Sequence, residues 1–215
     1  NHFVWKTTNG GSDWTPTEVA FATQKMSFPD ENTGYLQGFF TGILKTTDAG
    51  ATWIAQPTPG SFEQPGVGCT LDFRNADYGF ASAANGRIFR TTDGGANWTQ
   101  IYVTGAGGTC VSMTHRDTFY VGAENGLIYK TSNGGVSYKV VLELPQGPVN
   151  ELFFFDSQKG FACSDNGLIA RTEDGGATWA AMQTAGTFDI SDITFVNEDL
   201  GYASANEGVV YKTVD

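Results

Sequence analysis

Short apolar runs alternate with polar, glycine-rich turns along the whole chain. In one stretch, runs at residues 149–154, 160–163, 168–172 and 178–182 are separated by turn residues. Runs of this length that are rich in aromatic and β-branched side chains predict strands. Asn-Gly pairs at 125–126 and 166–167 favour tight hairpins, because both residue types tolerate positive φ. The stretch therefore predicts four short antiparallel strands, and no segment shows a helical period.

Five nine-residue segments, here called box segments, mark a repeat of this pattern. Each begins with Lys or Arg and ends with Trp or Tyr, and they occupy residues 6–14, 45–53, 90–98, 130–138 and 171–179. With Lys212, the leading cations stand at 6, 45, 90, 130, 171 and 212, which gives periods of 39, 45, 40, 41 and 41. A period of about 40 to 45 residues with four strands per unit is typical of β-propeller blades.

The repeat predicts an all-β fold, a β-propeller of four-stranded antiparallel blades with five blades visible. We expect a single domain over residues 1–215, with repeat units at approximately 15–53, 54–98, 99–138, 139–179 and 180–215 plus 1–14. The count comes to twenty-one strands, one more than five blades need. Either five blades close on themselves, with the N-terminal strand completing the last blade and residues 3–7 surplus, or the chain is part of a longer propeller.

The box segments resemble the Asp-box, or BNR repeat, of the form Ser/Thr-x-Asp-x-Gly-x-Thr-Trp. A longer pattern precedes the box segments, as in Phe-Pro-Asp-Glu-Asn-Thr-Gly-Tyr at 28–35 and Ile-Thr-Phe-Val-Asn-Glu-Asp-Leu-Gly-Tyr at 193–202. This pattern resembles the BNR-like repeats of the photosystem II assembly and stability factor family and of related secreted bacterial proteins. The resemblance covers nearly the whole chain and implies a propeller.

Two features depart from that family pattern. In the third repeat Met113 replaces the usual Phe and Phe119 replaces the usual Gly, so we expect altered packing in that blade. The resemblance also implies an arginine-rich partner-binding surface. The five arginines of this chain are scattered over different repeat positions, so that surface is not reproduced.

Charge and cysteine content narrow the range of partners. With 12 basic and 23 acidic residues the net charge is −11, which repels phosphate backbones and anionic lipid. We therefore expect no nucleic acid partner, and no apolar run is long enough for membrane insertion. Three cysteines without CxxC spacing indicate neither a disulfide framework nor a zinc site. We expect Cys69 and Cys110 to be reduced, and no cofactor or metal is predicted.

The carboxylates do not form a convincing catalytic set. Asp48, Asp93 and Asp174 recur once per blade, so they are expected to be bonded within their own turns and not to converge on one metal or substrate. A sialidase would need a cluster of three arginines, which the scattered arginines do not provide. Glu124, Asp165 and Glu207 fall in equivalent loops, which keeps a two-carboxylate glycosidase as an alternative.

Aromatic loop residues are the candidate partner-binding site. Phe39 and Phe40 stand in a short glycine-flanked turn, and Phe62 stands in the longest connection, among three prolines. Together they predict an apolar contact patch. The alternative is that they pack on one another as a private core of the loops.

These observations predict a non-catalytic protein-interaction or scaffold propeller. We expect it to be exported (extracellular, at the cell surface or periplasmic) and to be a component of a larger assembly with protein partners. The alternatives are a carbohydrate-active or carbohydrate-binding propeller, with a glycan as ligand, and a role like that of a photosystem assembly factor.

Overall fold

The protein is built from strands throughout. The computed structural model describes residues 1–38, 42–58, 70–83, 87–103, 107–145 and 147–214. Twenty-one strands and one short 3-10 turn, η3 (Asn206–Gly208), lie within these residues. The all-β prediction of antiparallel propeller blades is confirmed. The chain divides into two compact units: the first holds Asn1–Ala84 and Ile88–Gln100, and the second holds Asn85–Arg87 and Ile101–Asp215.

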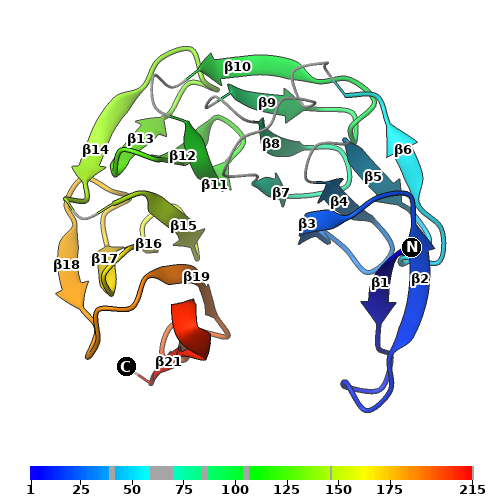
Figure 1. Cartoon of the computed structure of the whole chain (residues 1–215). Coiled ribbons are helices and arrows are strands. Elements are labelled where there is room, and N and C mark those ends of the chain that lie inside the picture. Colours follow the sequence, from blue (N-terminus) through cyan, green and yellow to red (C-terminus); the bar gives the residue numbers. More distant parts are fainter. Residues whose placement is uncertain (39–41, 59–69, 84–86, 104–106, 146, 215) are drawn as a thin grey trace. The chain divides into compact units, whose positions relative to one another are not determined.

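The first unit contains a hairpin and two blades (Figure 1). The hairpin is β1 (His2–Lys6) and β2 (Thr15–Val19). The next blade is β3 (Thr23–Ser27), β4 (Gly34–Gly38), β5 (Ile43–Thr46) and β6 (Ile54–Gln56). The following blade is β7 (Leu71–Phe73), β8 (Gly79–Ala83), β9 (Arg87–Thr91) and β10 (Thr99–Val103), whose last residues pass into the second unit. The N-terminal strand that sequence alone left surplus pairs with β2, from His2 opposite Val19 to Lys6 opposite Thr15.

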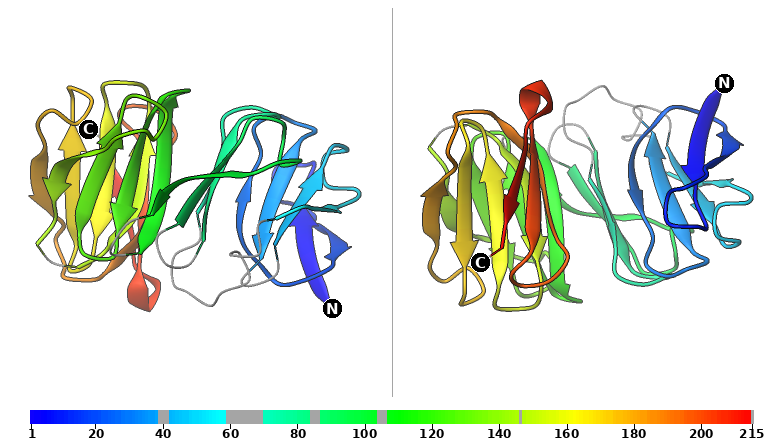
Figure 2. Two further views of the ribbon diagram at one scale, coloured as in Figure 1. Left: turned by 90° about the horizontal axis from the view of Figure 1, so that it is seen from above. Right: turned by 90° about the horizontal axis from the view of Figure 1, so that it is seen from below.

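The second unit contains three further sheets, which lie side by side in Figure 2. The first is β11 (Gly108–His115), β12 (Thr118–Ala123), β13 (Leu127–Thr131) and β14 (Lys139–Glu143). The second is β15 (Val149–Phe154), β16 (Gly160–Ser164), β17 (Leu168–Thr172) and β18 (Ala180–Gln183). The third has three strands, β19 (Ile190–Phe195), β20 (Gly201–Ala205) and β21 (Val210–Thr213).

The cores lie between neighbouring sheets of each unit. Ile128 of β13, Leu152 of β15 and Ala170 of β17 belong to one buried cluster that joins two sheets. Cys110 and Cys163 are buried free thiols. Cys69 lies outside the described residues, so the expected reduced state of Cys69 with Cys110 stays a prediction.

The box carboxylates are bonded within their own turns, as predicted. In one turn the Thr46 hydroxyl donates to Asp48 Oδ1 at 2.7 Å, and the Thr52 amide donates to the same oxygen at 2.8 Å. Asp174 has the same bonds with Thr172 and Thr178. Hydrogen bonds from the side chain and amide of Thr52 lower the pKa of Asp48 to about 2, and those of Thr178 do the same for Asp174. These carboxylates stabilise their own turns and do not converge on one site.

The blade β11–β14 packs differently from its neighbours, as its sequence predicts. Phe154 lies opposite Gly160 and Phe195 opposite Gly201, and each ring covers the glycine so closely that a Cβ would clash with it. In β11–β14 the corresponding pair is Met113 opposite Phe119. The ring has moved to the facing strand, where Phe119 is fully buried and meets Tyr138 edge-on at 6.0 Å. An aromatic ring thus still fills this part of the core, but it comes from β12 and not from β11.

This exchange makes Met113 and Phe119 an energetically coupled pair. Phe119→Gly should destabilise the protein by about 3–5 kcal/mol, because it opens a cavity in the core. Adding Met113→Phe refills that space from the facing strand, so the double variant should recover at least half of the loss. Urea unfolding of the wild type, both single variants and the double variant measures the coupling. Additive effects of the two substitutions would contradict this packing.

The box carboxylates also predict an acid dependence of stability. Asp48 and Asp174 have folded pKa values of about 2, below the ordinary value of 3.8. Their ionised forms therefore contribute stability that is complete above about pH 4 and is lost as the pH falls toward 2. Replacing both by Asn, which already stands at box positions 9 and 133, should reduce the fall in urea midpoint between pH 4 and pH 2. Asp192→Asn, outside the box segments, is the control and should leave that fall unchanged. An equal fall in wild type and double variant would refute the assignment.

Candidate functional site

A stack of three rings joins the two sheets of a pair in each unit. In the first unit Tyr35 of β4 stacks on Phe73 of β7 with centroids 3.5 Å apart, and Trp98 meets Phe73 edge-on at 6.0 Å. In the second unit Tyr120, Phe154 and Trp179 repeat the arrangement at 4.0 and 6.1 Å. The box aromatic therefore covers the first strand of its own blade, and that strand's Phe stacks on the preceding sheet. Aromatic rings favour these offset and edge-on geometries.

A lysine ammonium and a tyrosine hydroxyl donate hydrogen bonds across the same junction. Lys45 Nζ donates to the carbonyl of Gly94 at 3.0 Å, and Lys130 Nζ donates to that of Gly175 at 2.5 Å. The Tyr120 hydroxyl also donates to the Gly175 carbonyl, at 2.6 Å. Burial raises the pKa of Tyr120 to about 12 and lowers the pKa of Lys130. Each box turn thus receives donors from the sheet that precedes it in the chain.

At β19–β21 the junction has only its first two rings. Phe161 of β16 stacks on Phe195 of β19 at 4.3 Å, and Arg171 lies over Phe161 at 5.7 Å. Within the described residues no box turn and no box aromatic follow on Phe195. A cavity of about 470 Å³ lies between β16–β18 and β19–β21. This volume is in the range of ligand-binding clefts.

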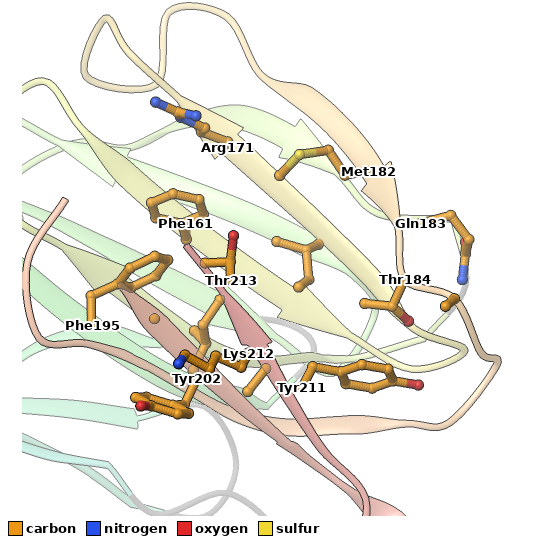
Figure 3. A pocket seen from close by; sticks show the side chains of 15 residues that line it. Phe161, Arg171, Met182, Gln183, Thr184, Phe195, Tyr202, Tyr211, Lys212 and Thr213 are labelled. Atoms are coloured by element: carbon orange, nitrogen blue, oxygen red, sulfur yellow. The ribbon is translucent and has the colours of Figure 1, made fainter. Parts of the chain in front are cut away.

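The cavity combines aromatic walls with one cation (Figure 3). Phe161, Phe195 and Tyr211 contribute rings, and Met182 contributes an apolar side chain from β18. Arg171 also lines the cavity, and its side chain is 44% exposed and ion-paired with Glu173. The cavity can therefore hold an apolar side chain, and a cation at its wall can donate hydrogen bonds to carbonyl or carboxylate oxygens beside it. Tyr202 and Lys212 are paired in β20 and β21, and their side chains lie on the face of the sheet opposite to Ala203 and Tyr211.

One polar group in the cavity wall is unsatisfied. The Tyr211 hydroxyl is buried and has no hydrogen-bond partner among the described residues.

The cavity does not fit two-carboxylate chemistry. No Asp or Glu is among the residues that line it. Glycoside hydrolysis usually needs a facing carboxylic acid and carboxylate. Across the described ranges, no group of three or more His, Cys, Asp or Glu is placed to hold a metal. No described helix is long and apolar enough to cross a membrane.

The residues predicted from sequence lie elsewhere. Phe39, Phe40 and Phe62 fall outside the described residues, so their role stays a prediction. Asp165 accepts a hydrogen bond from Asn150 at 2.9 Å, and Glu207 is exposed in η3 with a φ of 57°. Neither lines the cavity.

Solved structures show where this architecture occurs. A structure titled "YCF48 bound to D1 peptide" is 19% identical with a TM-score of 0.69, and the match covers 89% of this chain and 65% of that one. YCF48 from Cyanidioschyzon merolae is 16% identical with a TM-score of 0.77, covering 98% of this chain and 74% of that one. This chain thus spans about two thirds to three quarters of their lengths.

A glycosidase shares the fold as well. The GH74 xyloglucanase from Xanthomonas campestris is 14% identical with a TM-score of 0.71, covering 99% of this chain and 38% of that one. Identities this low establish the propeller fold alone. A search of curated proteins finds no match.

The family comparison is more specific. The sequence model described as "Photosynthesis system II assembly factor YCF48" matches residues 5–153, which is more than half of the 215 residues. The matched region includes the first four box segments and the altered third blade. By its sequence, this chain belongs to the YCF48 photosystem II assembly factor family.

Proposed function

We propose that this protein is a non-catalytic binding factor that holds an unfolded segment of a partner protein, as an assembly factor does. The observation that carries the proposal is the cavity between β16–β18 and β19–β21, with its aromatic rings and the cation Arg171. Aromatic and arginine side chains are enriched at protein-binding surfaces. A relative described as bound to a D1 peptide supports a peptide as the ligand.

We further propose that the protein is exported and takes part in a larger assembly. The acidic excess of 23 over 12 residues suits a dispersed, soluble factor outside the cytoplasm. Fractionation of source cells tests this compartment, and recovery in the cytoplasm alone would contradict it.

A carbohydrate ligand is the second candidate. The shared fold with GH74 proteins and the aromatic lining of the cavity favour it. The absence of carboxylates from the cavity lining argues against hydrolysis there, so a glycan would be bound and not cleaved at this place.

Panning a random peptide library on the immobilised protein tests the proposed function. Peptides should be enriched, and Met182→Ala should weaken their binding at least about tenfold, because it removes an exposed apolar side chain from the cavity. Val136→Ala, a highly exposed side chain on another blade, is the matched control and should leave binding unchanged. Peptides that bind both variants equally would place the site elsewhere. Binding of xyloglucan oligosaccharides without peptide binding would favour the second candidate.

A further inference from the structure

Five asparagine residues of the chain are followed directly by glycine, in pairs at 9–10, 85–86, 125–126, 133–134 and 166–167. Such pairs are prone to a reaction of the asparagine side chain with the main chain, because glycine has no side chain to hinder ring closure. The pair at 85–86 lies outside the described residues. The other four differ in their hydrogen bonds, so the structure distinguishes a reactive pair from protected ones.

The reaction forms a ring within the main chain. The amide nitrogen of the glycine loses its proton to water and bonds to Cγ of the asparagine, and the side-chain nitrogen leaves as ammonia. Water then opens the ring at either carbonyl, which gives aspartate or isoaspartate. The sum is amide plus water to carboxylate plus ammonium. Because Cγ must first turn to face the glycine nitrogen, hydrogen bonds that hold the side-chain amide in another position slow the reaction.

The two pairs in box turns have fully bonded side chains. Asn133 Oδ1 accepts hydrogen bonds from the Thr131 hydroxyl at 2.9 Å and from the Ser137 amide at 3.0 Å. Asn133 Nδ2 donates to the Ser137 hydroxyl at 2.9 Å. Asn9 has the corresponding three bonds within the first box segment. These amides form the turns that carboxylates form in the other box segments, so ring closure would first break the turn.

The pair at 166–167 is held through its main chain. The Asn166 amide donates to Asp189 Oδ1 at 3.0 Å, and the Asn166 carbonyl accepts a hydrogen bond from Gln183 Nε2. That carbonyl belongs to the same peptide group as the nitrogen that would attack. Both peptide groups around Asn166 are therefore fixed from outside the turn, which resists the rotation that ring closure requires.

Asn125 has the least restrained side chain of the four. The side chain is exposed, and its one hydrogen bond among the described residues is from the Leu127 amide to Oδ1 at 3.3 Å. Nδ2, the atom that leaves as ammonia, has no partner in that part of the chain. The Gly126 amide donates a hydrogen bond of 3.0 Å and the Gly134 amide one of 2.9 Å. The attacking nitrogens are thus alike, and the difference between the pairs lies in the asparagine side chains.

We propose that Asn125 is a spontaneous modification site, which converts to an aspartyl or isoaspartyl linkage in the folded protein while the box pairs stay intact. The isoaspartyl form has a main chain one atom longer beside Gly126, which is tightly packed. The Gly126 carbonyl accepts a hydrogen bond from the Leu144 amide at 2.8 Å, and a Cβ on Gly126 would clash with the Leu144 carbonyl oxygen. The longer main chain displaces Gly126 from Leu144 and loosens the end of β14. The inference goes beyond the proposed function and does not depend on the cavity.

Ageing of the whole protein in warm neutral buffer tests the inference, with the other pairs as internal controls. Samples are digested at intervals, and each Asn-Gly peptide and its products are quantified by mass spectrometry. Labelling with isoaspartyl methyltransferase identifies the isoaspartyl product. Conversion at Asn125 should be at least about tenfold faster than at Asn9, Asn133 or Asn166, because hydrogen bonds must break first at those three. Equal rates at Asn125 and Asn133, or no conversion at Asn125, would overturn the inference.

The same chain unfolded in guanidinium chloride is the matched control, because it keeps each local sequence and removes the contacts of the fold. The four pairs should then convert at similar rates. If Asn125 keeps its advantage in the unfolded chain, the neighbouring sequence and not the hydrogen bonds sets the rates, and the inference fails.

Two variants test the effect on the structure. Asn125→Gln should keep its urea midpoint during ageing, because glutamine would have to close a larger and less favourable ring, whereas aged wild type should gain a less stable population. Fresh Asn125→Asp carries the new charge beside Glu124 without the longer main chain, so its midpoint should stay close to that of fresh wild type. If the modified fraction of aged wild type unfolds like fresh Asn125→Asp, the displacement of Gly126 is refuted.

Discussion

Stacking between the second strand of one sheet and the first strand of the next is the interaction on which the rest of the structure depends. It fixes the glycine opposite each stacked Phe, because no other residue leaves room for the ring. It also fixes the box turn, whose carbonyl receives the Lys and Tyr donors of the preceding sheet. Because the carboxylate of the box is used inside its own turn, these turns are structural parts of the junction and not reactive groups.

The candidate site follows from the same junction. Where a full junction is present, the indole covers the Phe and the carbonyl receives the cation. At β19–β21 the Phe and the cation are present and a cavity lies beside them. The apolar and aromatic lining of this cavity is the basis of the proposed peptide binding.

The repeat spacing predicted the fold closely, whereas the site was missed. The strands 149–154 and 168–172 begin and end where the pattern placed them, because apolar runs and Gly turns are local signals. The exchange at Met113 and Phe119 was also visible, since it breaks an otherwise regular pairing. The cavity was not, because Phe161, Arg171 and Phe195 occupy ordinary repeat positions. Whether these side chains line a cavity depends on which strands pair in the sheet. The sequence pattern of unusual aromatic residues in loops indicated Phe39, Phe40 and Phe62 instead.

The central claim is that stacked rings join neighbouring sheets, and a double-mutant cycle between Tyr120 and Phe154 tests it most directly. The centroids of these two rings lie 4.0 Å apart, so the loss of unfolding free energy in the double variant Tyr120→Ala/Phe154→Ala should be smaller than the sum of the two single losses. Additive losses in urea unfolding would contradict the account.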